Sequence, residues 1–137
     1  MNKKEKETRD KSTKQPFKKS MHYAIDGLVH TLFHEKNFRT HILCLALVTL
    51  IGLFYQLSTY EWLAITLIST MVLMAEMFNT AIENTLDWLE PNHHEVVKIV
   101  KDICAGAVLV TAIGAIIIAI LIFTPKFIHS LHLIFEF

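Results

Sequence analysis

Four polar side chains follow one another at the end of an otherwise apolar stretch. Residues 62–75 read WLAITLISTMVLMA without a charge, and Glu76, Asn79, Glu83 and Asp87 then follow at intervals of three, four and four. At about 3.6 residues per turn, this spacing puts all four on one face of a helix, as a polar ladder. An ionisable side chain inside a bilayer costs about 3 kcal/mol, so Glu76 needs a partner or a function. A seam that only holds helices together is the weaker interpretation, because the apolar stretches offer these carboxylates no Lys or Arg partner.

More polar groups are expected at the same membrane boundary. Glu35 ends an earlier helical stretch, and Lys98, Lys101 and Asp102 begin a third apolar segment. Carboxylate and amide oxygens suit Mg²⁺, and lysine binds phosphate as a point charge. Hard-metal ligands beside phosphate-binding lysines, with a carboxylate deeper in lipid, predict phosphoryl transfer to a lipid hydroxyl. The sequence has none of the motifs of soluble kinases and nucleotidases, namely GxxxxGK[ST], GxGxxG, HRD and DFG.

Three apolar segments and one amphipathic segment must position these groups. The chain has 137 residues, 53% of them hydrophobic, which indicates one domain. Transmembrane helices are predicted at 41–57, 62–87 and 100–123, since a span needs about 20 mostly apolar residues. Residues 17–36 carry their apolar side chains on one stripe, which is typical of a helix on the membrane surface. The expected fold class is an all-α membrane protein, whose membrane domain (16–125) has an N-terminal amphipathic surface helix and three transmembrane helices.

The chain ends and the two cysteines carry less information. Residues 1–15 are rich in lysine and lack an apolar face, so they are predicted to form a disordered tail that stays in the cytoplasm. Residues 126–137 are predicted to form an interfacial tail. Cys44 and Cys104 lie in apolar segments and are expected to be buried thiols, because no disulfide framework or CxxC site surrounds them.

Two functions of other classes are also compatible with parts of the sequence. Intramembrane carboxylates mark proton paths, which would suit a small ion or proton transporter. Against it, the polar groups cluster at one end and leave the outer half of the third segment apolar. His30 and His34 are four residues apart and could pair on Zn²⁺ in a metal sensor, but only Glu35 or His41 could add a ligand on that face.

The polar ladder lies in a stretch that resembles a known family. The segment AEMFNTAIENTLDWLEPNHHEVVKIVKDICAGAVL (75–109) closely resembles the bacterial small integral-membrane lipid kinases, the prokaryotic diacylglycerol kinase and undecaprenol kinase family. Its pattern is E-x-x-N-[ST]-A-I-E-x-x-x-D, a His-rich loop and K-D-x-x-[AS]-[AG]-A-V. The upstream element G-x-x-x-x-x-x-x-E-x-x-F-R is matched by Gly27, Glu35, Phe38 and Arg39. The resemblance covers about residues 17–123.

The resemblance implies roles for individual residues. Glu76 corresponds to the general base and Asn79 to an active-site asparagine. Glu35 and Glu83 correspond to the carboxylates that hold Mg²⁺ and ATP. The other positions that match nucleotide contacts are Tyr23, Asn92, His93, His94, Lys101 and Asp102. Pro16 stands where a relative has a nucleotide-contacting arginine, and Lys14, Lys18 or Lys19 are the candidates to replace it.

The resemblance also implies an activity and a setting. It implies an ATP-dependent, Mg²⁺-requiring kinase of a lipid alcohol in the bacterial cell membrane, with a homotrimeric assembly and no nucleic-acid partner. The sequence pattern NTAIExTxDW…HHE…KDxxAGAV resembles that of the Gram-positive branch, whose members favour undecaprenol. Undecaprenol is therefore the expected substrate. Diacylglycerol stays open as the alternative, because both lipids present a primary hydroxyl at the interface.

Overall fold

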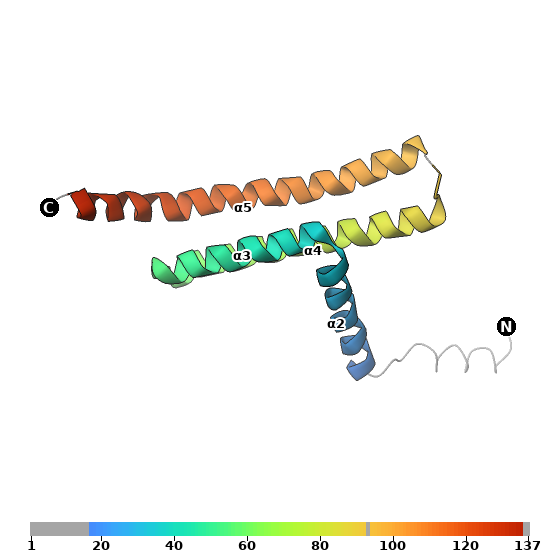
Figure 1. The fold of residues 1–137 in the computed structure, drawn as a ribbon, viewed down its shortest axis with the longest axis horizontal. Coiled ribbons are helices and arrows are strands. Elements are labelled where there is room, and N and C mark those ends of the chain that lie inside the picture. Colours follow the sequence, from blue (N-terminus) through green and yellow to red (C-terminus); the bar gives the residue numbers. More distant parts are fainter. Residues whose placement is uncertain (1–16, 93, 136–137) are drawn as a thin grey trace. The chain divides into compact units, whose positions relative to one another are not determined.

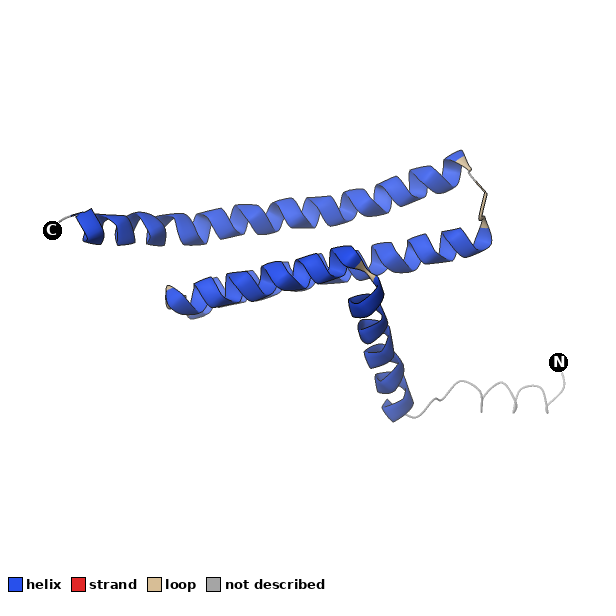
Figure 2. Cartoon of the chain, in the orientation of Figure 1, coloured by secondary structure: helices blue, strands red, loops and turns tan. Residues whose placement is uncertain are grey.

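The computed structural model describes residues 17–92 and 94–135, and these residues form helices joined by short loops, with no strand among them (Figure 2). The predicted tail 1–15 and Pro16 lie outside the described residues. The helices are α2 (Phe17–His34), α3 (Lys36–Phe54), α4 (Thr59–Leu89) and α5 (Glu95–Phe135). By length and composition α3, α4 and α5 can each cross a membrane. The prediction of an all-α multi-pass membrane protein is thus confirmed.

Each membrane helix extends beyond at least one end of its predicted span. α3 begins at Lys36 and ends at Phe54, whereas 41–57 was predicted. α4 and α5 extend past the predicted 62–87 and 100–123 at both ends. The reason is that an apolar run marks only the part of a helix that suits lipid, whereas backbone hydrogen bonds continue the helix into polar sequence.

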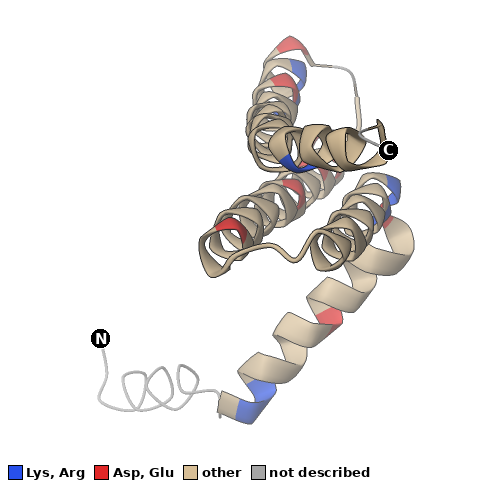
Figure 3. Cartoon of the chain, turned by 90° about the vertical axis from the view of Figure 1, so that its left-hand side faces the viewer, with Lys and Arg blue, Asp and Glu red and all other residues tan. Residues whose placement is uncertain are grey.

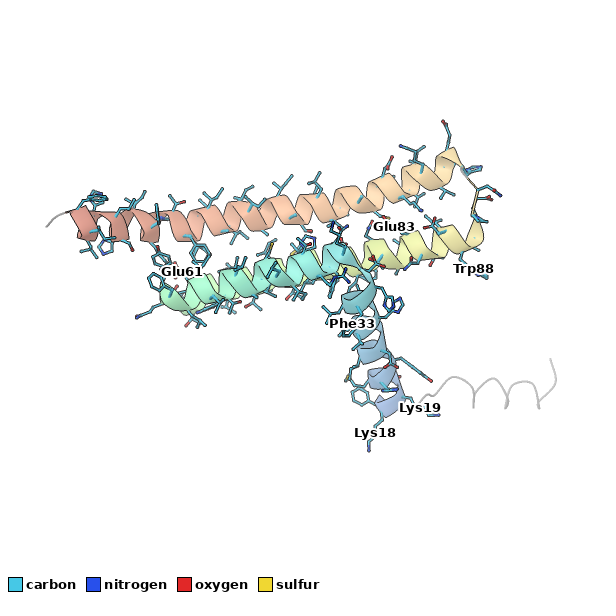
Figure 4. All side chains as sticks on the ribbon, in the orientation of Figure 1. Lys18, Lys19, Phe33, Glu61, Glu83 and Trp88 are labelled. Carbon is cyan, nitrogen blue, oxygen red and sulfur yellow. The ribbon has the colours of Figure 1, made fainter. Side chains whose placement is uncertain are left out.

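α2 is a separate unit and is described by itself. Its apolar side chains, among them Phe17, Met21 and Ile25, are exposed, as are those of Leu28 and Phe33. Lys18 and Lys19 lie at its first turn (Figure 4). An exposed apolar stripe with lysines at one end suits a membrane surface, and that location stays a prediction.

A close turn joins α3 to α4. Gln56 takes a positive φ of 51°, which lets the chain reverse, and the Leu57 N–H then donates to the Gly52 carbonyl at 3.1 Å. Ser58 and Glu61 form a capping box in which the Ser58 N–H donates to Glu61 Oε2 at 2.7 Å. A Cβ on Gly52 would lie 2.9 Å from the ring of Trp62, so only glycine allows this close approach of α4 to α3.

α4 and α5 run side by side in opposite directions (Figure 1). An ion pair lies at each end of their contact: Lys126 with Glu61 at 3.0 Å, and Lys101 with Asp87. α5 has 41 residues, so it is about 60 Å long, twice the thickness of the hydrocarbon layer. It continues through Pro125 and the predicted interfacial tail as far as Phe135, and it extends beyond the start of α4 (Figure 1).

The buried part of the described chain is narrow. Its buried apolar side chains are Phe38, Leu57, Ile65 and Val72. The expectation of buried thiols is wrong for Cys44, which is exposed, and Cys104 is only half-buried. In a membrane protein an apolar neighbourhood in sequence does not require burial within the chain, because lipid accepts apolar side chains as readily as a core does.

Candidate active site

The polar ladder of α4 runs from buried to exposed positions. Glu76 is 3% and Asn79 7% exposed, Glu83 is half-buried, and Asp87 is exposed. Glu83 lies in the half of α4 near the α5 connection, away from Glu61 at the other end of the helix (Figure 4). Few turns of α3, α4 and α5 carry a charge, and most of their length has none (Figure 3). The ladder thus concentrates ionisable groups in one part of an apolar bundle.

Glu76 lies among polar groups from two helices. Asn37 and His41 on α3, together with Glu83 and Glu35, lie close enough to the Glu76 carboxylate to act on it electrostatically. The sequence analysis did not single out Asn37. The spacing of Asn37 and His41 could have indicated a polar patch, because residues four apart on α3 share a face of the helix.

Asn79 joins the buried and exposed parts of the ladder. Its Nδ2 donates to Glu83 Oε1 at 3.1 Å. Its Oδ1 is buried and has no hydrogen-bond partner among the described residues. A buried acceptor is normally paired. The unpaired Asn79 oxygen, which lies beside a carboxylate, can accept a hydrogen bond from a hydroxyl group or coordinate a cation.

A polar cavity lies where α4 passes into α5. Lys101 on α5 pairs with Asp87 on α4, and Lys98 donates to Asp102 at 2.7 Å. The cavity measures about 380 Å³. Its lining consists of Asp87, Glu90, Pro91, Asn92, His94, Val97, Lys98, Lys101 and Asp102. The predicted contacts Asn92, His94, Lys101 and Asp102 therefore share one cavity, as a site for a polyanion with its counter-charges would require.

A second cavity begins one turn before Glu76. It measures about 270 Å³ and is lined by apolar side chains of α3, α4 and α5, with His41 at its wall. Val72 and Leu73 line it from α4, and Glu76 follows them on the same face. The buried carboxylate thus has an apolar cavity on one side along α4 and the polar ladder on the other.

The structure places most of the predicted site residues in two groups. Glu35, Glu76, Asn79 and Glu83 form one, and the polar cavity forms the other. Tyr23 lies on α2, which is described by itself, and His93 lies outside the described residues, so their predicted roles stay predictions.

The histidine pair gives the zinc alternative no support. The His30 and His34 rings are stacked with centroids 4.2 Å apart, and His34 Nδ1 lies 2.9 Å from the His30 carbonyl oxygen. Throughout the part of the chain that the structure describes, no group of three or more His, Cys, Asp or Glu is placed to hold a metal ion.

A Mg²⁺ ion bound together with a nucleotide fits this arrangement better than an ion held by protein alone. Magnesium keeps several waters and is usually bound through one or two carboxylates and substrate phosphates. Glu35 and Glu83 both lie near Glu76, and the unpaired Asn79 oxygen adjoins Glu83. Glu35, Glu83 and the Asn79 oxygen are the groups that would hold such an ion together with substrate phosphates.

Comparison with known proteins identifies the family. Residues 22–123 match the family model described as prokaryotic diacylglycerol kinase. The chain is 40% identical over 110 residues to the undecaprenol kinase of Bacillus subtilis, which covers 80% of this chain and 89% of that protein. It is 36% identical over 101 residues to a diacylglycerol kinase of Synechocystis, which covers 72% of this chain and 57% of that longer protein. The chain therefore belongs to the prokaryotic diacylglycerol kinase family of membrane lipid kinases.

Proposed function

We propose that this kinase transfers the γ-phosphoryl group of ATP to undecaprenol and makes undecaprenyl phosphate. The observation that carries this choice of lipid is the 40% identity to an undecaprenol kinase along 89% of that relative's length. The relative named as a diacylglycerol kinase is less similar and is matched over 57% of its length. Diacylglycerol is accordingly the competing substrate in the test below.

Glu76 is the proposed general base. It accepts the proton of the lipid hydroxyl as that oxygen attacks the γ-phosphorus, while the bond from phosphorus to the β–γ bridging oxygen breaks and ADP leaves. The burial of Glu76 and the apolar cavity next to it support this role. A polyprenol can keep its chain in an apolar setting while its hydroxyl reaches the carboxylate.

Glu35, Asn79 and Glu83 are the proposed ligands of the Mg²⁺ that accompanies ATP. When bound, the ion neutralises charge on the phosphate oxygens. Lys101 and Asp102 are proposed to contact the nucleotide, together with Asn92 and His94 in the loop before α5 and the predicted contacts Tyr23 and His93. The polar cavity that contains the four described residues of the α4–α5 end supports this assignment.

The orientation in the membrane follows from the need for ATP. The polar cavity must face the cytoplasm, and the lysine-rich N-terminus belongs on the same side by the positive-inside rule. The homotrimer is part of the same proposal, and the exposed apolar side chains of α3, α4 and α5 leave surface for neighbouring copies or lipid.

Purified protein in mixed micelles, supplied with labelled ATP, tests the lipid choice. Undecaprenol and diacylglycerol are offered in parallel at equal surface concentration, and kcat/KM is compared. We expect undecaprenol to be favoured by about tenfold or more, which corresponds to about 1.4 kcal/mol in the barrier. Equal rates, or faster diacylglycerol turnover, would assign the chain to the diacylglycerol kinases of the same family.

A further inference from the structure

An apolar cavity that the proposed chemistry does not use lies between α3 and α5, toward the ends of both helices that are far from the polar cavity. It measures about 550 Å³, and we name it the outer cavity. The apolar cavity next to Glu76 is named the inner cavity. We propose that the outer cavity binds the distal part of the single hydrocarbon chain of the lipid substrate, whose first part lies in the inner cavity. This inference deepens the proposed function and rests on it.

The two cavities follow one another along the same two helices. On α3 the lining passes from Val48 in the inner cavity to Ile51 in the outer cavity. On α5 it passes from Ile116 to Ala119. Each step is three residues, which is less than one turn, so no full turn of either helix separates the cavities. Since α3 and α5 run in the same direction (Figure 1), the two walls stay paired and form one path.

This path begins at the level of the proposed base. Lys101 on α5 pairs with Asp87 on α4. Ala112 lies eleven residues after the first of these, and Glu76 lies eleven residues before the second. Because the two helices are antiparallel and rise equally per residue, Ala112 in the wall of the inner cavity is about level with Glu76. From there to Phe127, at the far end of the outer cavity, α5 extends about 22 Å.

The length of the path favours a long single chain. An acyl tail that stays in its own leaflet covers about 15 Å, half of a hydrocarbon layer of about 30 Å. Measured from Glu76, such a tail ends before Phe127. A polyprenol chain is much longer than an acyl tail and can follow the whole path. The outer cavity therefore offers a polyprenol contacts that a diacylglycerol reaches only in part.

The lining of the outer cavity suits a flexible hydrocarbon. Among the described residues that line it none is charged. The rings of Tyr55 and Phe123 contact each other across its wall, with their centroids 6.4 Å apart. Inside a membrane an apolar chain gains little by leaving lipid, so its preference for a protein cavity depends on packing contacts. The chain whose hydroxyl is held at Glu76 is the apolar group that already points along this path.

Ala119→Phe places a ring in the outer cavity and tests the proposal. We expect kcat/KM for undecaprenol to fall by about tenfold, as for a small misfit in an apolar pocket, and kcat/KM for farnesol to stay within about twofold. Farnesol is the comparison because its short chain ends near the inner cavity. Leu121→Phe is the matched control, since it puts a ring at an exposed position of α5 that lines neither cavity, and it should leave both values unchanged.

Crosslinking gives a second measurement that does not depend on turnover. Phe127 replaced by p-benzoylphenylalanine should crosslink to radiolabelled undecaprenol. Excess farnesol should reduce the yield, because both lipids compete for the inner cavity. The same group in place of Leu121 faces bulk lipid, and its yield should not respond to farnesol.

Three results would overturn the inference. One is a yield at Phe127 that farnesol does not change, which would indicate bulk lipid in the outer cavity. Another is an Ala119→Phe protein that loses turnover of undecaprenol and farnesol by the same factor. The third is altered assembly of that variant on size exclusion, which would assign the outer cavity to a neighbouring copy. None of these affects the proposed function, which fails separately if the parent protein does not favour undecaprenol over diacylglycerol.

Discussion

Glu76→Gln should separate the catalytic role of the buried carboxylate from its structural role. Glutamine has nearly the same shape and keeps one side-chain oxygen as a hydrogen-bond acceptor. It cannot accept a proton from the lipid hydroxyl. The variant therefore removes the proposed base with little change in the shape of the side chain.

The expected loss is large compared with any packing effect. A positioned general base contributes about 10²- to 10⁴-fold, which corresponds to about 3–5 kcal/mol in the barrier. The protein should be no less stable, because a neutral amide is less costly than a carboxylate at a site that is 3% exposed. Loss of turnover with retained or higher thermal stability is the pattern expected of a residue that serves function at the expense of stability.

The assay is phosphate transfer to undecaprenol at saturating ATP, with assembly checked by size exclusion in detergent. Glu61→Gln is the control, since it makes the same substitution on the same helix at the far end of α4. That variant loses its ion pair with Lys126, keeps a side-chain oxygen that can accept the Ser58 capping bond, and should keep about full turnover. A Glu76→Gln protein with activity within about threefold of the parent would refute the assignment of Glu76 as base.

The remaining predictions concern the metal, the nucleotide, the helix turn and the topology. Glu83→Gln should raise the Mg²⁺ concentration needed for half-maximal activity, and an unchanged titration would contradict its role as a ligand. Lys101→Ala should raise the KM for ATP by about tenfold and leave that for lipid unaltered, since its proposed contact is with phosphate. Gly52→Ala should lower the thermal midpoint, because its Cβ would lie 2.9 Å from the Trp62 ring; a midpoint within error of the parent would argue against the close approach. A single cysteine at position 94, in a cysteine-free background, should resist an impermeant reagent applied outside intact cells, and labelling there would reverse the proposed topology.

The sequence was sufficient to predict the helices and one face of the site. Spacing alone put Glu76, Asn79, Glu83 and Asp87 on one face of α4, and the structure has Asn79 bonded to Glu83 as that spacing requires. The ion pair between Lys101 and Asp87 was not predicted from the sequence, although both residues were expected at one membrane boundary. Periodicity reports on one helix, whereas a pair across two helices depends on their register.

The features that were missed all depend on what lies beside a helix. The four-residue spacing of Asn37 and His41 shows that they share a face of α3, but it does not show that this face lies near Glu76, which depends on how α3 passes α4. Cys44 was expected to be buried because its neighbours are apolar, yet it is exposed. In water an apolar stretch must find a protein core, but in lipid it need not, so the usual link between hydrophobicity and burial does not hold.

The length of α4 explains why carboxylates occur on a segment that suits lipid. Its 31 residues extend about 46 Å, more than the hydrocarbon layer of about 30 Å, so one straight helix can enter both lipid and water. Glu76 and Asp87 lie about 16 Å apart along that helix, with Asn79 and Glu83 between them. A lipid hydroxyl cannot leave the membrane without exposing its chain, and ATP cannot enter it without losing the hydration of its phosphates. Under the proposed function, α4 carries the base at its lipid end and nucleotide-binding groups at its water end, so it would bring the two substrates together without requiring either to cross the boundary.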